Sequence, residues 1–130
     1  MQVPSGLAVD AAGNVWVAYF RNNRIQRFSA SGEPLSGWGK LGKGKGELNG
    51  PRDVAVDALG RVYVADQVNE RLQVFAEDGR FLAVIGDPGD VRIPWVTSVE
   101  VNAEGVIFAA SEDQVQAFRL LLPAGDLLAP

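Results

Sequence analysis

Carboxylates and arginines are the groups of this chain with the most chemical potential, because its 130 residues include no histidine and no cysteine. Without histidine the chain has no Ser-His-Asp triad, no imidazole base and no histidine-ligated zinc. Without cysteine it has no disulfide and no thiolate nucleophile, and its redox compartment stays open. No obvious nucleophile–base pair is left, so the sequence favours a non-catalytic protein and we assign no catalytic residue.

Asp66 and Arg71 are the charged pair whose spacing most suggests a role. They stand at the two ends of the run DQVNER, which links two apolar segments. A carboxylate beside a guanidinium is held ionised and hydrogen-bonded, and a buried pair becomes costly when one partner is lost. We interpret Asp66 and Arg71 as a structural pair that braces this loop.

Calcium is the metal to consider in a chain rich in carboxylates. It needs roughly six to eight converging oxygens. Glu100 and Glu112 are isolated, and equivalent positions supply no ring of acidic residues. Asp10, Asp57 and Asn102 each precede a glycine by three residues, a spacing typical of tight turns. We therefore expect no metal site and no cofactor.

The glycine- and lysine-rich run GKLGKGKG, residues 39–46, invites comparison with a phosphate-binding loop. It lacks the G-x-x-x-x-G-K-[ST] pattern, because Lys45 is followed by Gly46 and no helical pattern begins there. We interpret the run as a flexible linker whose charges lie in water.

An internal repeat contains all of these residues. Nine residues of the first copy recur 47 positions later, and a weaker third copy follows at an offset near 45. The first-copy residues are Pro4, Asp10, Gly13, Ala18, Asn22, Arg24, Phe28, Gly32 and Gly39, and their counterparts are Pro51, Asp57, Gly60, Ala65, Asn69, Arg71, Phe75, Gly79 and Gly86. The third copy keeps Val99, Asn102, Gly105 and Ala110.

Each copy contains short strand-like runs separated by turn residues, with no helical periodicity. In the central copy these runs are Val54–Val56, Val62–Ala65, Arg71–Phe75 and Phe81–Ile85; in the first they are Leu7–Val9, Val15–Tyr19, Arg24–Phe28 and Pro34–Trp38. Four antiparallel strands in a repeat of roughly 40–47 residues are typical of a propeller blade. We predict an all-β fold, a β-propeller segment of three four-stranded antiparallel blades.

The predicted blades cover about residues 3–39, 50–86 and 93–130, with Leu127 and Leu128 in the last outer strand. Three blades cannot close a ring, because propellers have roughly 4–8. The chain is then half of a six-bladed propeller or a fragment of one. Its end blades should expose apolar faces, which a homodimer closing a six-bladed ring would cover. We expect Leu7, Val9, Val15 and Val17 on one face and Val99, Val101, Ile107 and Phe108 on the other.

The string from Pro51 to Gly79, PRDVAVDALGRVYVADQVNERLQVFAEDG, resembles an NHL repeat, and the resemblance extends over nearly the whole chain as three copies. It implies one propeller blade per repeat, in a ring that is usually six-bladed. It also implies a platform that recognises protein, RNA or other ligands, although some related propellers are enzymes. The Asp–Arg pair is complete only in the middle copy: Tyr19 replaces the aspartate in the first, and Ser111 and Gln114 replace both residues in the third.

We expect the linker and the loops between second and third strands to emerge on one face, where recognition usually resides. Basic and aromatic side chains gather in these segments and favour a binding surface. The candidate binding residues are Phe20, Arg21, Asn22, Lys43, Lys45, Arg52, Gln67, Asn69 and Trp95. Trp16 is expected in the core, whereas Trp38 fits either the core or the surface.

The sequence therefore predicts an interaction module that binds a protein or peptide partner. An enzyme of the propeller lactonase or lyase type is the first alternative, and RNA binding by the same face is the second. The net charge of −4 counts against a phosphate backbone. No signal peptide or run of about 18 apolar residues is present, so we expect no membrane partner. Localisation stays open, with the cytoplasm slightly favoured.

Overall fold

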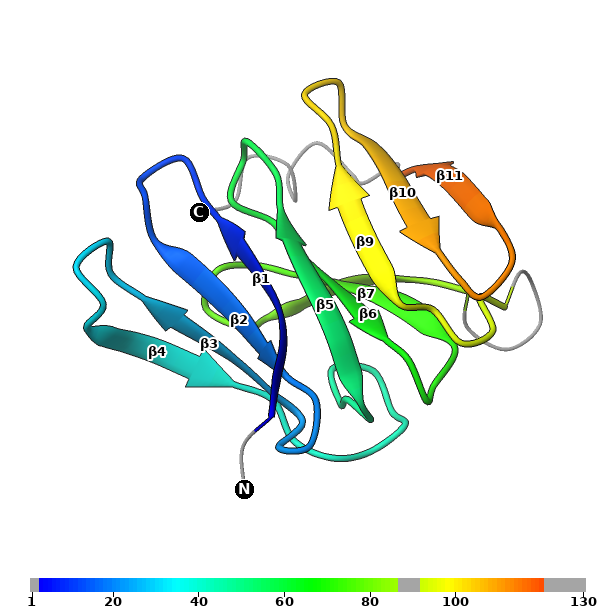
Figure 1. The fold of residues 1–130 in the computed structure, drawn as a ribbon, viewed down its shortest axis with the longest axis horizontal. Coiled ribbons are helices and arrows are strands. Elements are labelled where there is room, and N and C mark those ends of the chain that lie inside the picture. The colour runs from blue at the N-terminus through cyan, green and yellow to red at the C-terminus, as the bar shows by residue number, and fades with distance from the viewer. Residues whose placement is uncertain (1–2, 87–91, 121–130) are drawn as a thin grey trace.

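The computed structural model describes residues 3–86 and 92–120, and these fold into three antiparallel sheets without a helix (Figure 1). The first sheet contains β1 (Pro4–Val9), β2 (Val15–Tyr19), β3 (Arg24–Phe28) and β4 (Pro34–Trp38). The second contains β5 (Pro51–Val56), β6 (Val62–Asp66), β7 (Arg71–Phe75) and β8 (Phe81–Ile85). The third contains β9 (Ser98–Val101), β10 (Val106–Ala110) and β11 (Val115–Arg119).

This architecture confirms the predicted all-β propeller fold. Each of the first two sheets pairs its four strands in chain order, as a propeller blade does. The third sheet has three strands within residues 92–120. The outer strand expected at Leu127 and Leu128 lies outside the described residues.

The first hairpin of every sheet is closed by the same turn chemistry. The Oδ1 atoms of Asp10, Asp57 and Asn102 each accept hydrogen bonds from the backbone amides two and four residues downstream, at 2.9 or 3.0 Å. A glycine in the left-handed region follows, for example Gly60 with φ 84°. These side chains serve the turns, as the spacing predicts.

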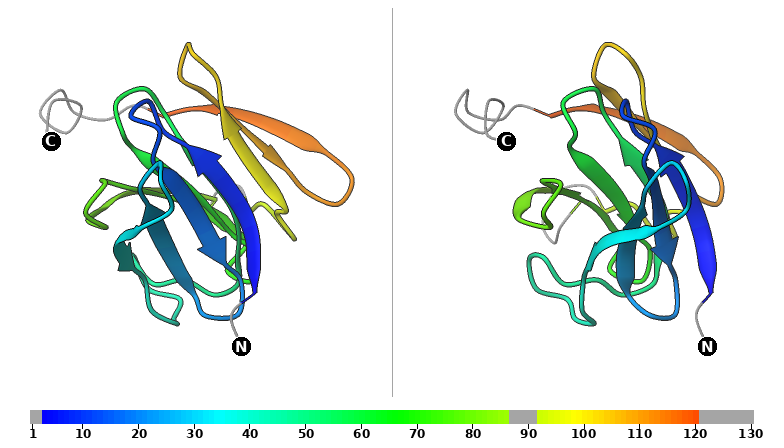
Figure 2. Two further views of the ribbon diagram at one scale, coloured as in Figure 1. Left: turned by 60° about the vertical axis from the view of Figure 1, so that its left-hand side comes forward. Right: turned by 90° about the vertical axis from the view of Figure 1, so that its left-hand side faces the viewer.

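The first strands of the three sheets, β1, β5 and β9, lie side by side (Figures 1 and 2). Ser5 Oγ donates a hydrogen bond to the Pro51 carbonyl at 3.1 Å, and the Val99 amide donates to Asp53 Oδ2 at 3.0 Å. Gly6 allows the close approach of β1 to β5, because a Cβ there would collide with the Asp53 side chain. Adjacent blades are thus joined along their inner strands.

The hydrophobic core lies in two layers, one on each face of the middle sheet. Between the first and second sheets, Trp16 and Ile25 pack with Val64 and Phe75. Trp38 lies 4.5 Å from Phe75 between ring centroids, which places it in this layer as well. Every residue of β6 and β7 is buried, since both faces of the middle sheet are covered.

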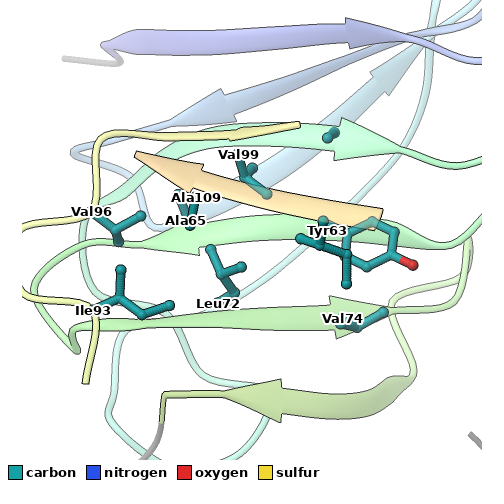
Figure 3. Close-up of a cluster of buried hydrophobic side chains, with 10 residues drawn as sticks. Tyr63, Ala65, Leu72, Val74, Ile93, Val96, Val99 and Ala109 are labelled. Atoms are coloured by element: carbon teal, nitrogen blue, oxygen red, sulfur yellow. The ribbon is translucent and has the colours of Figure 1, made fainter. Parts of the chain in front are cut away.

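The second layer joins the middle and third sheets (Figure 3). Tyr63, Leu72 and Val74 of the middle sheet meet Val99 and Ala109 of the third. Burial in this layer gives the short third sheet its main anchorage, because its outer face has no neighbour among the described residues.

The outer faces of the first and third sheets are open, and the sheets do not close into a ring. Leu7 is 66% exposed on the first. On the third, the predicted apolar face is partly wrong: Val99 and Ile107 are buried against the middle sheet, and Phe108 is 38% exposed on the other side. Successive strand residues point to opposite faces, so Ile107 and Phe108 cannot share one. None of the described residues forms a helix long and apolar enough to span a membrane.

Candidate interaction surface

We call the end of the strands that carries the linkers between blades the loop face, and the opposite end, with the aspartate turns, the turn end. The loop face comprises the first linker (residues 39–50), the first two residues of β5 (51–52), the described part of the second linker (92–97), and the turns at 20–23, 67–70 and 111–114. The connections of the three sheets converge on this end of the strands; in Figure 1 those of the first and middle blades lie at the lower edge and the β10–β11 connection lies at the right-hand side. This convergence matches the arrangement expected from the strand order.

The glycine- and lysine-rich linker is ordered by contacts with the middle blade, which corrects the prediction that it is flexible. Arg71 donates from Nη1 to the Lys43 carbonyl at 3.2 Å, and from Nη2 to the carbonyls of Gly44 and Glu47 at 2.8 and 2.9 Å. Gln73 accepts from the Gly46 amide at 2.9 Å. Backbone carbonyls of the linker therefore surround a buried guanidinium, a contact that the local sequence does not reveal.

Asp66 is the carboxylate at the centre of this network. Its Oδ2 accepts from Arg71 Nε and Asn69 Nδ2, both at 2.9 Å, and from Gln73 Nε2 at 3.1 Å. Its Oδ1 accepts from the Asn49 amide at 2.7 Å. Asp66 and Arg71 are both buried, so each charge is compensated by its partner and by hydrogen bonds.

Both linkers attach to the β6–β7 turn, residues 67–70. On one side, Asn69 Nδ2 donates to the Gly42 carbonyl at 3.0 Å and the Val68 amide donates to the Asn49 carbonyl at 3.0 Å. On the other side, the Ile93 amide donates to the Glu70 carbonyl at 3.0 Å. The turn thus connects the two linkers into one continuous surface.

The candidate binding residues differ in how accessible they are. Gln67 is only 2% exposed, and its Nε2 donates to the Val96 carbonyl at 3.0 Å, so its assignment to an open surface is wrong. It is buried because the second linker lies over it, a tertiary contact. Asn69 is half-buried and committed to the first linker. Phe20 and Asn22 are half-buried, whereas Arg21, Lys43, Lys45, Arg52 and Trp95 are exposed.

Phe20 and Arg52 come from different sheets and meet on the loop face. The Arg52 guanidinium carbon lies 4.9 Å from the centroid of the Phe20 ring, a cation–π contact. Gly50 lies beneath them with φ 68°, and a Cβ there would be 3.0 Å from both Phe20 Cε1 and Val68 Cγ2. The exposed Val68 extends this patch. It was not among the candidate binding residues, although an apolar residue within a polar loop is a sequence signal for an exposed contact.

Trp95 occupies the position in the second linker that corresponds to Gly50 in the first. Both residues have a left-handed backbone conformation, with φ 57° at Trp95. Gly50 lies two positions after the buried Leu48, and Trp95 lies two positions after the buried Ile93. The left-handed region is unfavourable for a bulky residue, and strain of this kind is on the order of 1–3 kcal/mol. Trp95 is nevertheless 57% exposed, so burial does not offset the strain.

The turn end is hollowed between neighbouring turns. One hollow of about 340 Å³ includes Asp10, Arg27 and Glu77, and another of about 370 Å³ includes Arg61 and Arg119. Asp10 and Asp57 are engaged in the turns, and Glu77 pairs with Arg27 at 3.6 Å. Within residues 3–86 and 92–120, no three acidic, histidine or cysteine side chains are grouped to hold a metal ion.

Asp10 illustrates this engagement. Its Oδ2 accepts from the Trp16 indole at 3.1 Å, and its Oδ1 closes the turn. Burial raises the pKa of Asp10, but the bonds from Trp16 and the backbone outweigh it and hold the pKa below the usual 3.8. Asp53 behaves oppositely: burial between β5 and β9 raises its pKa, against hydrogen bonds from two backbone amides. Asp10 therefore stays ionised as part of the scaffold.

The three sheets and the connections between them define a β-propeller segment. Residues 1–28 and 48–75 match the family model of the NHL repeat. The chain thus carries NHL repeats, folded as propeller blades. A search of curated proteins gives no match.

Solved structures support the fold. A nidogen/laminin complex superposes with a TM-score of 0.69 at 22% identity, covering 91% of this chain and 44% of that one. A catalytically inactive histidine-to-alanine variant of virginiamycin B lyase from Staphylococcus aureus, with quinupristin, gives 0.66 at 15% identity, covering 92% and 42%. PorZ of Porphyromonas gingivalis gives 0.66 at 20% identity, covering 89% and 17%. The chain spans less than half the length of each.

Proposed function

We propose that this chain is a non-catalytic interaction module that binds a protein or peptide partner across the loop face. The observation that carries this proposal is the strained, exposed Trp95 on a surface whose linkers are fixed by buried hydrogen bonds. Tryptophan is a favoured anchor residue in protein interfaces. A surface already ordered before binding loses little conformational entropy when a partner arrives.

The enzyme alternative has less support. Virginiamycin B lyase has the same fold, and the solved variant is inactive after a histidine was replaced. These 130 residues contain no histidine, so this part of the protein could not itself supply that group. The nidogen/laminin structure, by contrast, is of a complex between proteins, and its propeller resembles this chain equally well. We therefore place protein binding first.

Selection from a displayed random-peptide library tests the proposal. The wild-type chain should enrich a set of peptides, and the double variant Trp95→Gly/Val68→Ser should lose them. Glycine is chosen at position 95 because it adopts the left-handed region without strain. Leu35→Ser/Leu59→Ser, which changes two exposed apolar residues at or near the turn end, is the matched control and should retain the peptides.

Thermal melting of all three proteins establishes that they are folded. No enrichment by folded wild-type protein, or enrichment that survives the loop-face double variant, would refute the proposed function. Loss of enrichment in the control variant would move the binding surface away from the loop face.

A further inference from the structure

We infer that the partner segment is acidic, an inference that rests on the loop-face function proposed above. The first observation is the position of the lysines. All three lysines of the chain, Lys40, Lys43 and Lys45, fall within six residues of the first linker. Arg21 and Arg52 lie on the same face, although the chain as a whole has a net charge of −4. The part of the loop face that carries these five residues is therefore basic on an acidic protein, whereas the β10–β11 turn carries Glu112 and Asp113.

Most of these charges are not neutralised by the protein. Lys40 pairs with Glu47 at 3.7 Å, and Arg92 pairs with Glu70 at 3.0 Å. Across the described ranges, the other four cations form no ion pair with a carboxylate. We call these four the basic cluster: Arg21, Lys43, Lys45 and Arg52. Like charges on one face without counter-charges raise the local potential and attract an anionic partner.

The linker holds its part of the basic cluster at a defined place. The backbone carbonyl of Lys43 accepts a hydrogen bond from Arg71. The amide of Gly46, next to Lys45, donates one to Gln73. Asn23 accepts from the Gly50 amide at 2.9 Å, which secures the end of the linker to the first blade. The buried cation Arg71 thus fixes a loop that displays two exposed cations. A displayed charge with a fixed backbone provides specificity as well as attraction.

The aromatic contacts favour an acidic peptide over a nucleic acid. Single-stranded nucleic acids need open aromatic faces on which bases stack. One face of Phe20 is covered by the Arg52 guanidinium, at 4.9 Å. Among the described loop-face residues this leaves Trp95 as the one exposed aromatic ring, too few for successive bases to stack on, and together with the exposed Val68 it offers apolar contact to a side chain. The matching partner is a peptide segment rich in aspartate and glutamate with an apolar residue among them.

Fluorescence anisotropy with designed probes tests this inference. The probe is a fluorescein-labelled 12-residue peptide with six glutamates around one central leucine. Its counterpart has glutamine at the six acidic positions, and a labelled 12-nucleotide oligouridylate represents RNA. We expect Lys43→Gln/Lys45→Gln to weaken binding of the acidic probe about tenfold, as two surface ion pairs at up to roughly 0.7 kcal/mol each would give.

The matched control removes the same charge from the turn end. Arg80→Gln/Arg119→Gln should change the affinity for the acidic probe by less than about twofold, because screening confines surface charge effects to roughly 10 Å. Raising the salt concentration should weaken wild-type binding and have a smaller effect on the lysine variant.

Several results would overturn the inference. Equal binding of the glutamine peptide would mean that acid groups are not recognised. Tighter binding of the oligouridylate, lost in the lysine variant, would assign the basic cluster to RNA. No binding of the acidic probe also defeats the inference. In each case the peptide selection still decides the proposed function: neutral peptides that compete for the loop face would uphold it.

Discussion

The first and middle blades share nine repeat positions but differ in how they treat the loop face. In the middle blade, Asp66 and Arg71 are buried beneath the linker that precedes the blade. In the first blade, the corresponding residues are Tyr19 and Arg24, both half-buried, without a carboxylate at that position. The same repeat therefore supports a buried charged network only where a linker and two neighbouring sheets enclose it.

This difference shows that a blade is completed by its neighbours. The residues of β6 and β7 are buried on both sides, whereas β1 alternates between exposed and half-buried positions. Removing charges from water is offset only by full hydrogen bonding, which the enclosing linker supplies. The middle blade should therefore respond far more strongly to mutation than the first blade.

The largest effect is expected from Asp66→Ala. The change leaves the buried Arg71 without its carboxylate and the Asn49 amide without an acceptor, so the free energy of unfolding should fall by on the order of 3–5 kcal/mol. Equilibrium urea unfolding measures the loss.

Arg24→Ala, at the equivalent of Arg71 in the first blade, is the matched control and should cost less than about 1 kcal/mol. If Asp66→Ala unfolded like the wild type yet failed in the peptide selection, the carboxylate would belong to the binding site itself.

A leucine-to-alanine change should cost more stability on a sheet face covered by a neighbouring blade than on an open face. Leu72→Ala in the middle blade should cost about 2–5 kcal/mol, because Leu72 is fully buried. Leu7→Ala on the open face of the first blade should cost less than about 0.5 kcal/mol. Urea unfolding at two protein concentrations gives both values. A large, concentration-dependent cost at Leu7 would instead indicate that a second copy covers this face, as the half-ring dimer requires.

Asp10→Asn tests the turn that the blades share. Asparagine, as at Asn102, keeps the Oδ1 bonds of the turn but presents a donor to the Trp16 indole, so stability at pH 7 should fall by about 1 kcal/mol. The folded-state pKa of Asp10 is below 3.8, so its contribution is complete above that pH and disappears as the pH falls through the folded-state pKa. Urea unfolding at pH 7, 5, 4 and 3 should show the two proteins converging at the acid end. A constant gap would exclude the charge as its cause.

The smallest effect on stability is expected from Trp95→Gly. Glycine relieves the left-handed strain but increases the entropy of the unfolded chain, and the two terms nearly cancel, within about 1 kcal/mol. Thermal melting measures this balance. A loss of stability well above that range would mean that the Trp95 side chain supports the fold. Trp95 would then not differ from Gly50, which shares its left-handed backbone, by serving binding alone.

The sequence by itself determined the elements. Alternation, turn residues and the repeat offset predict the eight strands of the first two blades, the turns at Asp10, Asp57 and Asn102, and the propeller class. These features can be predicted because strand pairing and turn geometry depend on residues close together in the chain.

Only the tertiary structure decided which of these residues are available at the loop face. Gln67 is buried by the second linker, and Phe20 meets Arg52 across two sheets. The linker is ordered by Arg71, whose contacts lie 24 to 28 residues away in the chain. Each of these three contacts depends on how sheets and linkers pack together. Because the partners are distant in sequence, they leave no local pattern from which the contact could be inferred.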